Sequence, residues 1–326
     1  MNTFNKICKR SVWVLLTVFF AIWFVVFTVG KPIAMKNDGW INKYFDINPW
    51  EMVKDENDDP TQARYYKSDY ETMNSDGTVT YNHNAMRNNS MSVATKVATE
   101  GSVLLWNDDV DGKPALPLAG GSKISLFGIS CLESNYIYSG EGSGHVTITT
   151  TDNLKSSCED EGLTVNNQLW NAYRLVKTKG FGRAQGGNYS GVTDDPNYRE
   201  FKVGEATWDA LNSTTFGDIT PSVRQYGDAA VMIISRNGGE DGNTDFPAPE
   251  CLNENYMDLA INEDEILTKL DEMKANGTIK KIVLLINSAA AMSMENILEH
   301  DIDACMWVGM GGNASYDQLA KLLAGS

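Results

Sequence analysis

The sequence predicts an α/β fold: a mostly parallel, doubly wound sheet with helices on both faces, preceded by one transmembrane helix. Two observations indicate this arrangement. An uncharged apolar run of membrane-spanning length lies near the N-terminus, and further along the chain short apolar runs alternate with helical patterns. Continuous apolarity is typical of parallel strands, because both faces of such strands are covered. Strands and helices that alternate in this way form a doubly wound layer.

The apolar run over residues 11–29 carries no charge, and its length is close to the roughly 20 residues that a helix needs to cross a bilayer. Lys6, Lys9 and Arg10 precede the run, so the positive-inside rule favours a cytoplasmic N-terminus and an extracytoplasmic globular part. A cleaved signal peptide is the alternative, although its apolar region is normally shorter and residues 28–30 match a cleavage site poorly. A buried core helix is excluded because the run has no polar face.

These patterns divide the chain into four parts. We expect a cytoplasmic tail over residues 1–10, a transmembrane signal anchor over 11–30, an extended linker over 31–86 and an α/β domain over 87–326. The domain is expected to be truncated at its C-terminus. The whole chain would then be a single-pass protein of the cell membrane.

Within the α/β domain, a helical pattern that begins near Asn88 leads into the first apolar run. The runs expected to form strands are 103–106, 124–127, 229–234, 282–286 and 304–308. The start of one covering helix can be predicted, because Asn262 can cap it and Glu265 stands at the third position of a capping box. The pair at 276–277, Asn-Gly, is expected to end that helix.

Composition and charge exclude several classes of protein. The formal net charge of -16 comes from scattered acidic residues, without the basic stripe that neutralises phosphates, so nucleic acid is not an expected partner. The cysteines lack metal-ligand or disulfide spacing, and the histidines are far apart, so we expect buried or incidental thiols, no metal and no cofactor. These residues are Cys8, Cys131, Cys158, Cys251, Cys305, His83, His145 and His300.

Candidate functional residues follow the predicted strands, because ligands of open α/β sheets bind beyond the carboxyl ends of the strands. The loop after residue 234 is glycine-rich and holds Arg236 and Glu240, where a solvated acidic turn is the structural alternative. The segment 139–144 includes Ser143 and Gly144 and lacks the order of a nucleotide-binding loop, so a plain turn is its alternative. A third polar strand end is the pair Asn-Ser at 287–288.

Taken in order, several segments resemble the second domain of family 3 glycoside hydrolases. In that family the domain opens with a helix ending in Glu-Gly and an apolar strand with Leu-Leu-x-Asn. A Leu-Pro-Leu turn and a strand closing on Phe-Gly follow. In this chain these features stand at 98–107, 116–118 and 123–128, and later landmarks stand at 142–146, 234–240, 285–288 and 311–312. The resemblance covers roughly residues 88–326.

The resemblance implies part of a retaining β-glycosidase, often a β-glucosidase, that hydrolyses O-glycosidic bonds of oligosaccharides or β-glucosides. The family's acid/base glutamate falls on Glu240, although Gly239 replaces the serine of the pattern and Asp241 intervenes before the next glycine. The resemblance also makes three residues expected substrate-binding residues: Arg236, Ser143 and Gly144. A structural salt bridge is the alternative role for Arg236.

The family's nucleophile is an aspartate on a barrel, and we expect no nucleophile in this chain. Nothing in it reads as eight βα units. The anchor ahead of the α/β domain resembles the reversed domain order of the family, which places the barrel after Ser326. The alternatives are a non-catalytic extracytoplasmic domain that binds sugar or a partner, and a sensor module that is similar to the enzyme only in fold.

Overall fold

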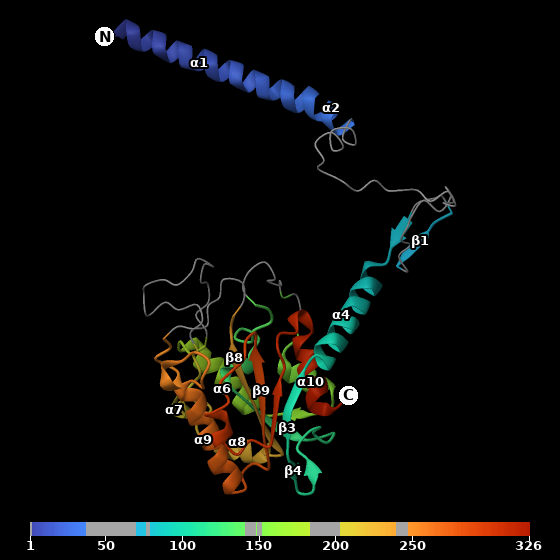
Figure 1. The fold of residues 1–326 in the computed structure, drawn as a ribbon, viewed down its shortest axis with the longest axis vertical. Helices are drawn as coiled ribbons and strands as arrows, with labels where there is room; N and C mark the ends of the chain where they lie inside the picture. Colours follow the sequence, from blue (N-terminus) through green and yellow to red (C-terminus); the bar gives the residue numbers. More distant parts are fainter. Residues whose placement is uncertain are drawn as a thin grey trace. The chain divides into compact units, whose positions relative to one another are not determined.

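The computed structural model describes residues 2–36, 70–75, 79–140, 148, 152–182, 203–238 and 247–326. The chain divides into two compact units, Met1–Glu71 and Thr72–Ser326 (Figure 1). The first unit holds the N-terminal helix and the second holds the α/β domain.

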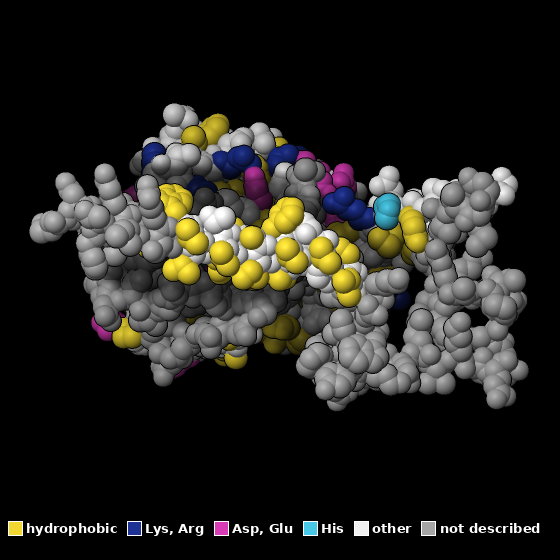
Figure 2. Space-filling view, turned by 90° about the horizontal axis from the view of Figure 1, so that it is seen from above, with side chains coloured by type: hydrophobic (Ala, Val, Ile, Leu, Met, Phe, Trp, Pro, Cys, Tyr) yellow, Lys and Arg dark blue, Asp and Glu magenta, His cyan; other side chains and the backbone are white. Residues whose placement is uncertain are grey.

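The N-terminal helix is long and apolar enough to cross a membrane over Val12–Ile33. It consists of α1 (Asn2–Val25), a π-helical turn η1 (Val26–Gly30) and α2 (Lys31–Lys36). At about 1.5 Å per residue, these 22 residues reach across a hydrocarbon core of about 30 Å. The large apolar side chains of this span are exposed, and they form a continuous apolar surface along the helix (Figure 2). A signal sequence near the N-terminus can also be long and apolar enough to meet this criterion, so the span alone is weak evidence for a membrane anchor.

The range expected to be an extended linker contains regular structure where it is described. Strands β1 (Glu71–Met73) and β2 (Val79–Tyr81) pair as a small sheet. Helix α4 (His83–Glu100) then starts five residues before the helical pattern at Asn88. It starts there because the side chain of Asn82 accepts a hydrogen bond from the backbone N–H of Ala85, which caps the helix. Residues 37–69 and 76–78 lie outside the described residues.

The α/β domain is built on a six-stranded sheet in the order β3-β10-β9-β8-β6-β7. All neighbouring strands are parallel except β3, which runs antiparallel to β10 at one edge. The predicted mostly parallel sheet is therefore confirmed. The strands are β3 (Val103–Asn107), β6 (Lys123–Phe127), β7 (Thr164–Val165), β8 (Ala229–Arg236), β9 (Ile282–Ser288) and β10 (Ala304–Trp307), with a separate hairpin of β4 (Asp109–Val110) and β5 (Lys113–Pro114).

Helices cover the sheet as two groups (Figure 1). In the order of the sheet, the connection from β6 to β7 moves toward the β7 edge. The connections from β7 to β8 and from β8 to β9 move in the opposite direction, toward the β3 edge. Right-handed connections therefore place α5 on one face and α6, α8 and α9 on the other. Helix α10 contacts α4 and α5, and α7 contacts α6 and α9. The helices are α5 (Leu154–Asp160), α6 (Asn167–Thr178), α7 (Trp208–Asn212), α8 (Thr220–Gln225), α9 (Ile261–Ala275) and α10 (Ser315–Ala324), with 3-10 turns at Ile129–Cys131, Leu252–Glu254, Ile297–Glu299 and Gly312–Ala314.

The core lies around the two central strands, since every residue of β8 and β9 is buried. At the end of β6 the chain passes very close to β8. Gly128 has φ +89°, and a Cβ atom there would lie 2.3 Å from the carbonyl oxygen of Ile233. Only glycine fits this position. The predicted buried thiols are confirmed for Cys131, Cys158, Cys251 and Cys305, all free, while the side chain of Cys8 is not described.

Helix α9 begins two residues earlier than the predicted cap allows, because Ala260 rather than Asn262 is its N-cap residue. Its first residue is Ile261, and the carboxylate of Glu263 accepts a hydrogen bond of 2.8 Å from the backbone N–H of Ala260. The expectation that Asn262 caps the helix with Glu265 is therefore wrong, because the side chain of Asn262 points to a long-range partner instead and donates to the carbonyl oxygen of Glu205. The predicted end of the helix at 276–277 is confirmed.

Candidate functional site

Two of the polar strand ends that the sequence singles out lie side by side. Strands β8 and β9 pair in parallel to their last residues, with Ser235 opposite Asn287 and Arg236 opposite Ser288. Parallel strands end at the same edge of a sheet, which is where open α/β folds bind ligands. Of the other predicted site residues, Glu240, Ser143 and Gly144 lie outside the described residues.

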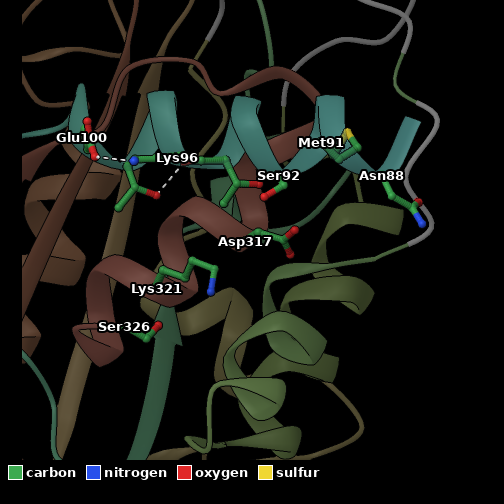
Figure 3. Close-up of a pocket in the computed structure, with 10 residues that line it drawn as sticks. Asn88, Met91, Ser92, Lys96, Glu100, Asp317, Lys321 and Ser326 are labelled. Atoms are coloured by element: carbon green, nitrogen blue, oxygen red, sulfur yellow. Dashed lines mark hydrogen bonds and ion pairs between the residues drawn. The ribbon is translucent and has the colours of Figure 1, made fainter. Parts of the chain in front are cut away.

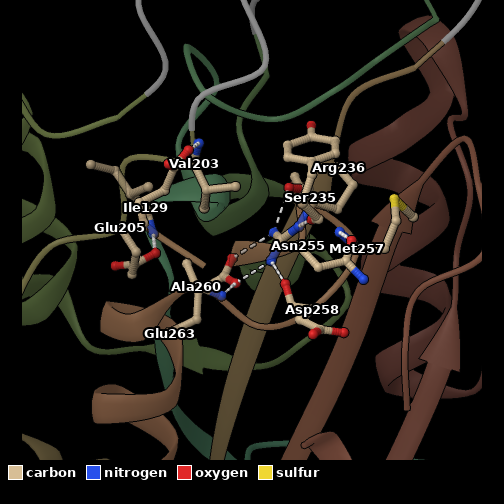
Figure 4. A network of polar contacts seen from close by, with 12 residues as sticks. Ile129, Val203, Glu205, Ser235, Arg236, Asn255, Met257, Asp258, Ala260 and Glu263 are labelled. Atoms are coloured by element: carbon tan, nitrogen blue, oxygen red, sulfur yellow. Dashed lines mark hydrogen bonds and ion pairs between the residues drawn. The ribbon is translucent and has the colours of Figure 1, made fainter. Parts of the chain in front are cut away.

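Arg236 is completely buried at the end of β8 and forms a two-pronged salt bridge with Glu263 of α9 (Figure 4). Its Nη1 and Nη2 atoms donate to the two carboxylate oxygens at 3.0 and 2.6 Å. The remaining guanidinium N–H groups donate to backbone carbonyl oxygens. These acceptors belong to Tyr256 (2.7 Å), Ser235 (2.9 Å) and Asp258 (2.6 Å).

Arg236 keeps its charge inside the domain. Burial by itself would lower the pKa of Arg236, but the adjacent carboxylate of Glu263 outweighs burial and raises that pKa. All five N–H donors of Arg236 are used within the chain, so the guanidinium has no donor to offer a sugar hydroxyl. The salt bridge that the sequence allowed as an alternative role is the arrangement observed.

Arg236 instead fixes the backbone around the point where the chain leaves β8. The ring of Tyr256 lies 5.6 Å from the guanidinium carbon, and its hydroxyl accepts a hydrogen bond of 2.7 Å from the backbone N–H of Asn237. The side chain of Asn237 in turn accepts from the N–H of Gly238. Hydrogen bonds therefore hold the backbone at Asn237 and Gly238, which precede Glu240 in the sequence.

Asn287 is a second buried polar hub at the same edge. Its Oδ1 atom accepts hydrogen bonds from the backbone N–H of Ile137 (2.9 Å) and the hydroxyl of Ser235 (2.7 Å). Its Nδ2 atom donates to the carbonyl oxygens of Ile137 (2.8 Å) and Gly309 (2.6 Å). The side chain thus uses both donors and accepts two bonds, and it joins the ends of three strands to the segment that follows β6.

Glu205 is a buried acid that sequence reasoning missed. Its carboxyl group accepts hydrogen bonds from the backbone N–H groups of Ile129 (2.7 Å) and Ala206 (3.0 Å). Burial raises the pKa of Glu205 to about 8, although these N–H groups and a hydrogen bond with Tyr173 act in the opposite direction. No local pattern marks this residue, because its burial depends on elements more than 30 residues away in the sequence.

A separate groove of about 680 Å³ lies between α4 and α10 (Figure 3). Most of its lining residues are of polar or charged types, and its two lysines already have acidic neighbours. Lys96 lies 3.8 Å from Glu100, and Lys321 lies 3.0 Å from Glu161. The groove therefore presents no unpaired lysine, and its lining shares no residue with the hubs around Arg236 and Asn287. Its lining residues are Asn88, Met91, Ser92, Thr95, Lys96, Thr99, Glu100, Asp317, Lys321 and Ser326.

Comparison with solved structures shows the fold of β-glucosidases. A β-glucosidase from Paenibacillus barengoltzii is 23% identical with a TM-score of 0.54, and the match covers 72% of this chain and 23% of that chain. β-Glucosidase 3B from Thermotoga neapolitana, in complex with α-D-glucose, is 22% identical with a TM-score of 0.52, over 73% of this chain and 29% of that chain. This chain thus spans about a quarter of their length. No curated protein matches it.

The sequence also matches a family model over residues 102–326, which is more than half of the chain. That model describes the C-terminal domain of glycosyl hydrolase family 3. The matched range begins at the residue before β3 and includes every strand of the six-stranded sheet. This chain belongs to glycosyl hydrolase family 3 through its C-terminal-type α/β domain.

Proposed function

We propose that this chain supplies the acid/base domain of a retaining β-glycosidase that acts on β-glucosides or oligosaccharides, with Glu240 as the general acid/base. The observation that carries the proposal is the fixed end of β8. Arg236 and Tyr256 hold the backbone there, four residues before Glu240. An acid/base needs such a support, because it must reach the glycosidic oxygen within hydrogen-bond distance.

The chemistry needs two carboxyl groups about 5 to 5.5 Å apart. The nucleophilic carboxylate attacks the anomeric carbon and forms a glycosyl ester, while the bond to the leaving oxygen breaks and Glu240 gives its proton to that oxygen. Glu240, now ionised, then takes a proton from the water that hydrolyses the ester. We assign the nucleophile to an aspartate of a barrel domain C-terminal to this α/β domain, because the family resemblance implies such a barrel and the described helices and strands form no run of eight βα units.

The other predicted site residues have different parts in this proposal. Ser143 and Gly144 contact the sugar, because they belong to a glycine-rich segment that follows β6. Arg236 acts indirectly: all of its guanidinium donors bind within the chain, and it holds the end of β8, after which Glu240 follows in the sequence.

A direct test replaces Glu240 in the protein expressed from its complete gene. For substrates with poor leaving groups, Glu240→Ala should lower turnover by about 100- to 10,000-fold, the usual contribution of general acid/base catalysis. Azide or a 2,4-dinitrophenyl leaving group should restore part of the rate, because neither needs proton transfer. Asp241→Ala, which removes the neighbouring carboxylate, is the matched control and should keep most of the activity. Unchanged turnover in Glu240→Ala would refute the assignment.

A non-catalytic domain that binds sugar or a partner is the second candidate. It rests on the polar ends of β8 and β9, which lie at the edge of the sheet where open α/β folds bind ligands. It predicts that the chain of 326 residues binds glucose or cellobiose, which isothermal titration calorimetry at millimolar sugar would detect. A flat titration counts against this candidate and leaves the catalytic one in place.

We also propose that the chain is anchored in the cell membrane through residues 11–30, with the N-terminus in the cytoplasm and the α/β domain outside. The apolar span over Val12–Ile33 supports the anchor. The protein should stay in the membrane pellet after alkaline carbonate extraction, and intact-mass analysis should find the N-terminal segment still attached. A mature N-terminus beyond residue 30 would instead show that the segment is a cleaved signal peptide.

A further inference from the structure

One edge of the α/β domain carries an apolar surface that no other described part of the chain covers. It runs along helix α4 and into the edge strand β3, which follows the helix directly (Figure 1). Six large apolar residues there are 43–66% exposed. We call them the outer apolar surface: Met86, Val93, Val97, Val103, Leu104 and Leu105. The other exposed large apolar residues described in the unit Thr72–Ser326 are Tyr81, Phe216, Ile261 and Leu298.

The part of this surface on α4 lies opposite the face by which the helix packs on the domain. Met86, Val93 and Val97 are separated by seven and four residues, a spacing that places them on one side of a helix. Thr95 lies two residues from Val93 and from Val97, which places it on the other side, and it is only 7% exposed. That other side faces α10, which contacts α4, and Thr95 lines the groove between the two helices. The apolar stripe therefore faces outward from a helix whose other face is already used.

Strand β3 continues the surface because of an irregularity in its pairing. Its register with β10 shifts between Cys305 and Met306, so Leu105 has no partner residue in that strand. Such a bulge interrupts the ladder, and the three apolar residues 103–105 are all exposed. A bulged edge is poorly suited to accept a further strand. A partner on this edge is therefore expected to pack against side chains and not to extend the sheet.

The charge of this region favours contact with a second copy of the chain. The chain as a whole carries a formal net charge of -16, which makes two copies repel each other over most of their surfaces. Residues 83–107, which contain α4 and β3, include two basic residues and one acidic residue, and their net charge is therefore +1. These three residues are Arg87, Lys96 and Glu100. Two copies that meet through this region avoid the like-charge repulsion found elsewhere.

The size of the outer apolar surface suits a contact of modest affinity. Full burial of a side chain of this size removes about 60–120 Å² from water, so six half-exposed side chains offer about 200–350 Å² per copy. A standard interface buries roughly 800 Å² per partner, and a little more than half of that area is apolar. The surface thus supplies roughly half or more of the apolar area that such an interface needs, and the polar residues beside the stripe can form the rim.

We propose that the outer apolar surface is the contact between two copies of this chain, which associate about a two-fold axis. In such a dimer the same patch of each copy packs against its counterpart, so a single apolar surface without like charges is sufficient. The contact removes from water the apolar side chains that one copy leaves exposed on α4 and β3. This inference goes beyond the proposed function and does not depend on the role of Glu240.

The experiment measures the oligomeric state of the chain of 326 residues in detergent by sedimentation velocity, from about 1 to 100 µM, a range suited to an interface of this size. The unmodified chain should pass from monomer to dimer. Val97→Lys and Leu104→Lys should each raise the dimer Kd at least about tenfold, because the two-fold contact buries two unpaired charges. Leu298→Lys is the matched control, since Leu298 and Val97 are both 66% exposed. The control should change the Kd less than about twofold.

Hydrogen exchange locates the contact. Peptides covering 86–105 should exchange at least about threefold more slowly at about 100 µM than at about 1 µM, whereas peptides covering 261–275 should not change. A chain that stays monomeric over the whole range would overturn the proposal. A dimer that Val97→Lys and Leu104→Lys leave intact would also overturn it, because another surface, such as the N-terminal helix, would then hold the copies together.

The protein expressed from its complete gene distinguishes a second copy from a further domain of the same chain. If that protein dimerises and responds to Val97→Lys as the chain of 326 residues does, the second copy is the occupant of the surface. If it is monomeric and its residues 86–105 are protected at every concentration, a further domain covers the surface, and the proposal of a second copy is wrong.

Discussion

Breaking the salt bridge between Arg236 and Glu263 by removing one partner should be among the most destabilising single substitutions in the domain. Both side chains are almost fully buried, with 0% and 3% of their surface exposed, and the shortest N–O distance is 2.6 Å. Glu263→Gln leaves a buried cation without its counter-charge, which costs about 3–5 kcal/mol. For a domain of this size, each 1 kcal/mol lowers the midpoint of thermal unfolding by about 2–4 °C, so a fall of about 6–20 °C is expected.

An exposed pair of the same length provides the control. Lys280 and Asp228 also approach to 2.6 Å, but their side chains are 64% and 35% exposed. Lys280→Met should therefore lower the free energy of unfolding by no more than about 1 kcal/mol. Urea unfolding followed by tryptophan fluorescence, with the full chain in detergent, measures both losses. The double variant Arg236→Met with Glu263→Leu should recover part of the loss, since apolar replacement of both partners is often neutral. Comparable small losses in Glu263→Gln and Lys280→Met would refute the reasoning that burial decides the effect.

Two further predictions concern Gly128 and Glu205. Gly128→Ala should destabilise the domain more than Gly121→Ala in chemical denaturation. Both glycines have positive φ, so an alanine costs about 1–3 kcal/mol at either position, but only at Gly128 would its Cβ lie 2.3 Å from the oxygen of Ile233. Equal losses of stability in the two variants would contradict the close approach. The raised pKa of Glu205, about 8 against 4.5 for an exposed glutamate, means that the folded state keeps a proton which the unfolded state releases, so this stabilisation is complete below pH 4.5 and is lost as pH rises through about 8. Glu205→Gln should flatten the fall of the unfolding midpoint between pH 5 and 9, and parallel curves for the two proteins would show that another group is responsible.

The strands were predictable because their signal is local. Each central strand is a continuous apolar run, and burial on both faces of a parallel sheet requires that pattern. The predicted ends of these strands were less accurate. Strand β8 continues to Arg236 and β9 to Ser288, beyond the apolar runs that end at 234 and 286. Polar residues extend these strands because each strand supplies backbone partners for the other, and such pairing leaves no mark in a single segment.

The direction of β3 shows the same limit. Its apolar run is similar to those of the central strands, yet it pairs antiparallel with β10. Residues 103–105 are also largely exposed, unlike the residues of β8 and β9. An apolar pattern indicates that a segment is extended, but the direction of the segment depends on where the preceding helix α4 leaves it.

The sequence predicted where the polar residues of the candidate site lie, but it did not predict the role of each residue. The rule that ligands bind beyond strand ends located Arg236 and the pair at 287–288 correctly at one edge of the sheet. The partner of Arg236 stands 27 residues away, and that of Asn287 stands 150 residues away. A guanidinium in a polar segment can face a ligand or a buried carboxylate, and only the position of α9 decides between these roles.

Local physical chemistry therefore accounts for the N-terminal apolar helix, the α/β class and the edge of the sheet where polar groups gather. These properties depend on hydrophobic periodicity and on charge, which a single segment carries. The burial of Arg236 and Glu205, the amide hub at Asn287 and the register that aligns β8 with β9 depend on contacts between distant segments. Burial is what turns these polar residues from ordinary surface groups into fixed structural ones, and burial is a property of the packed domain rather than of any segment within it.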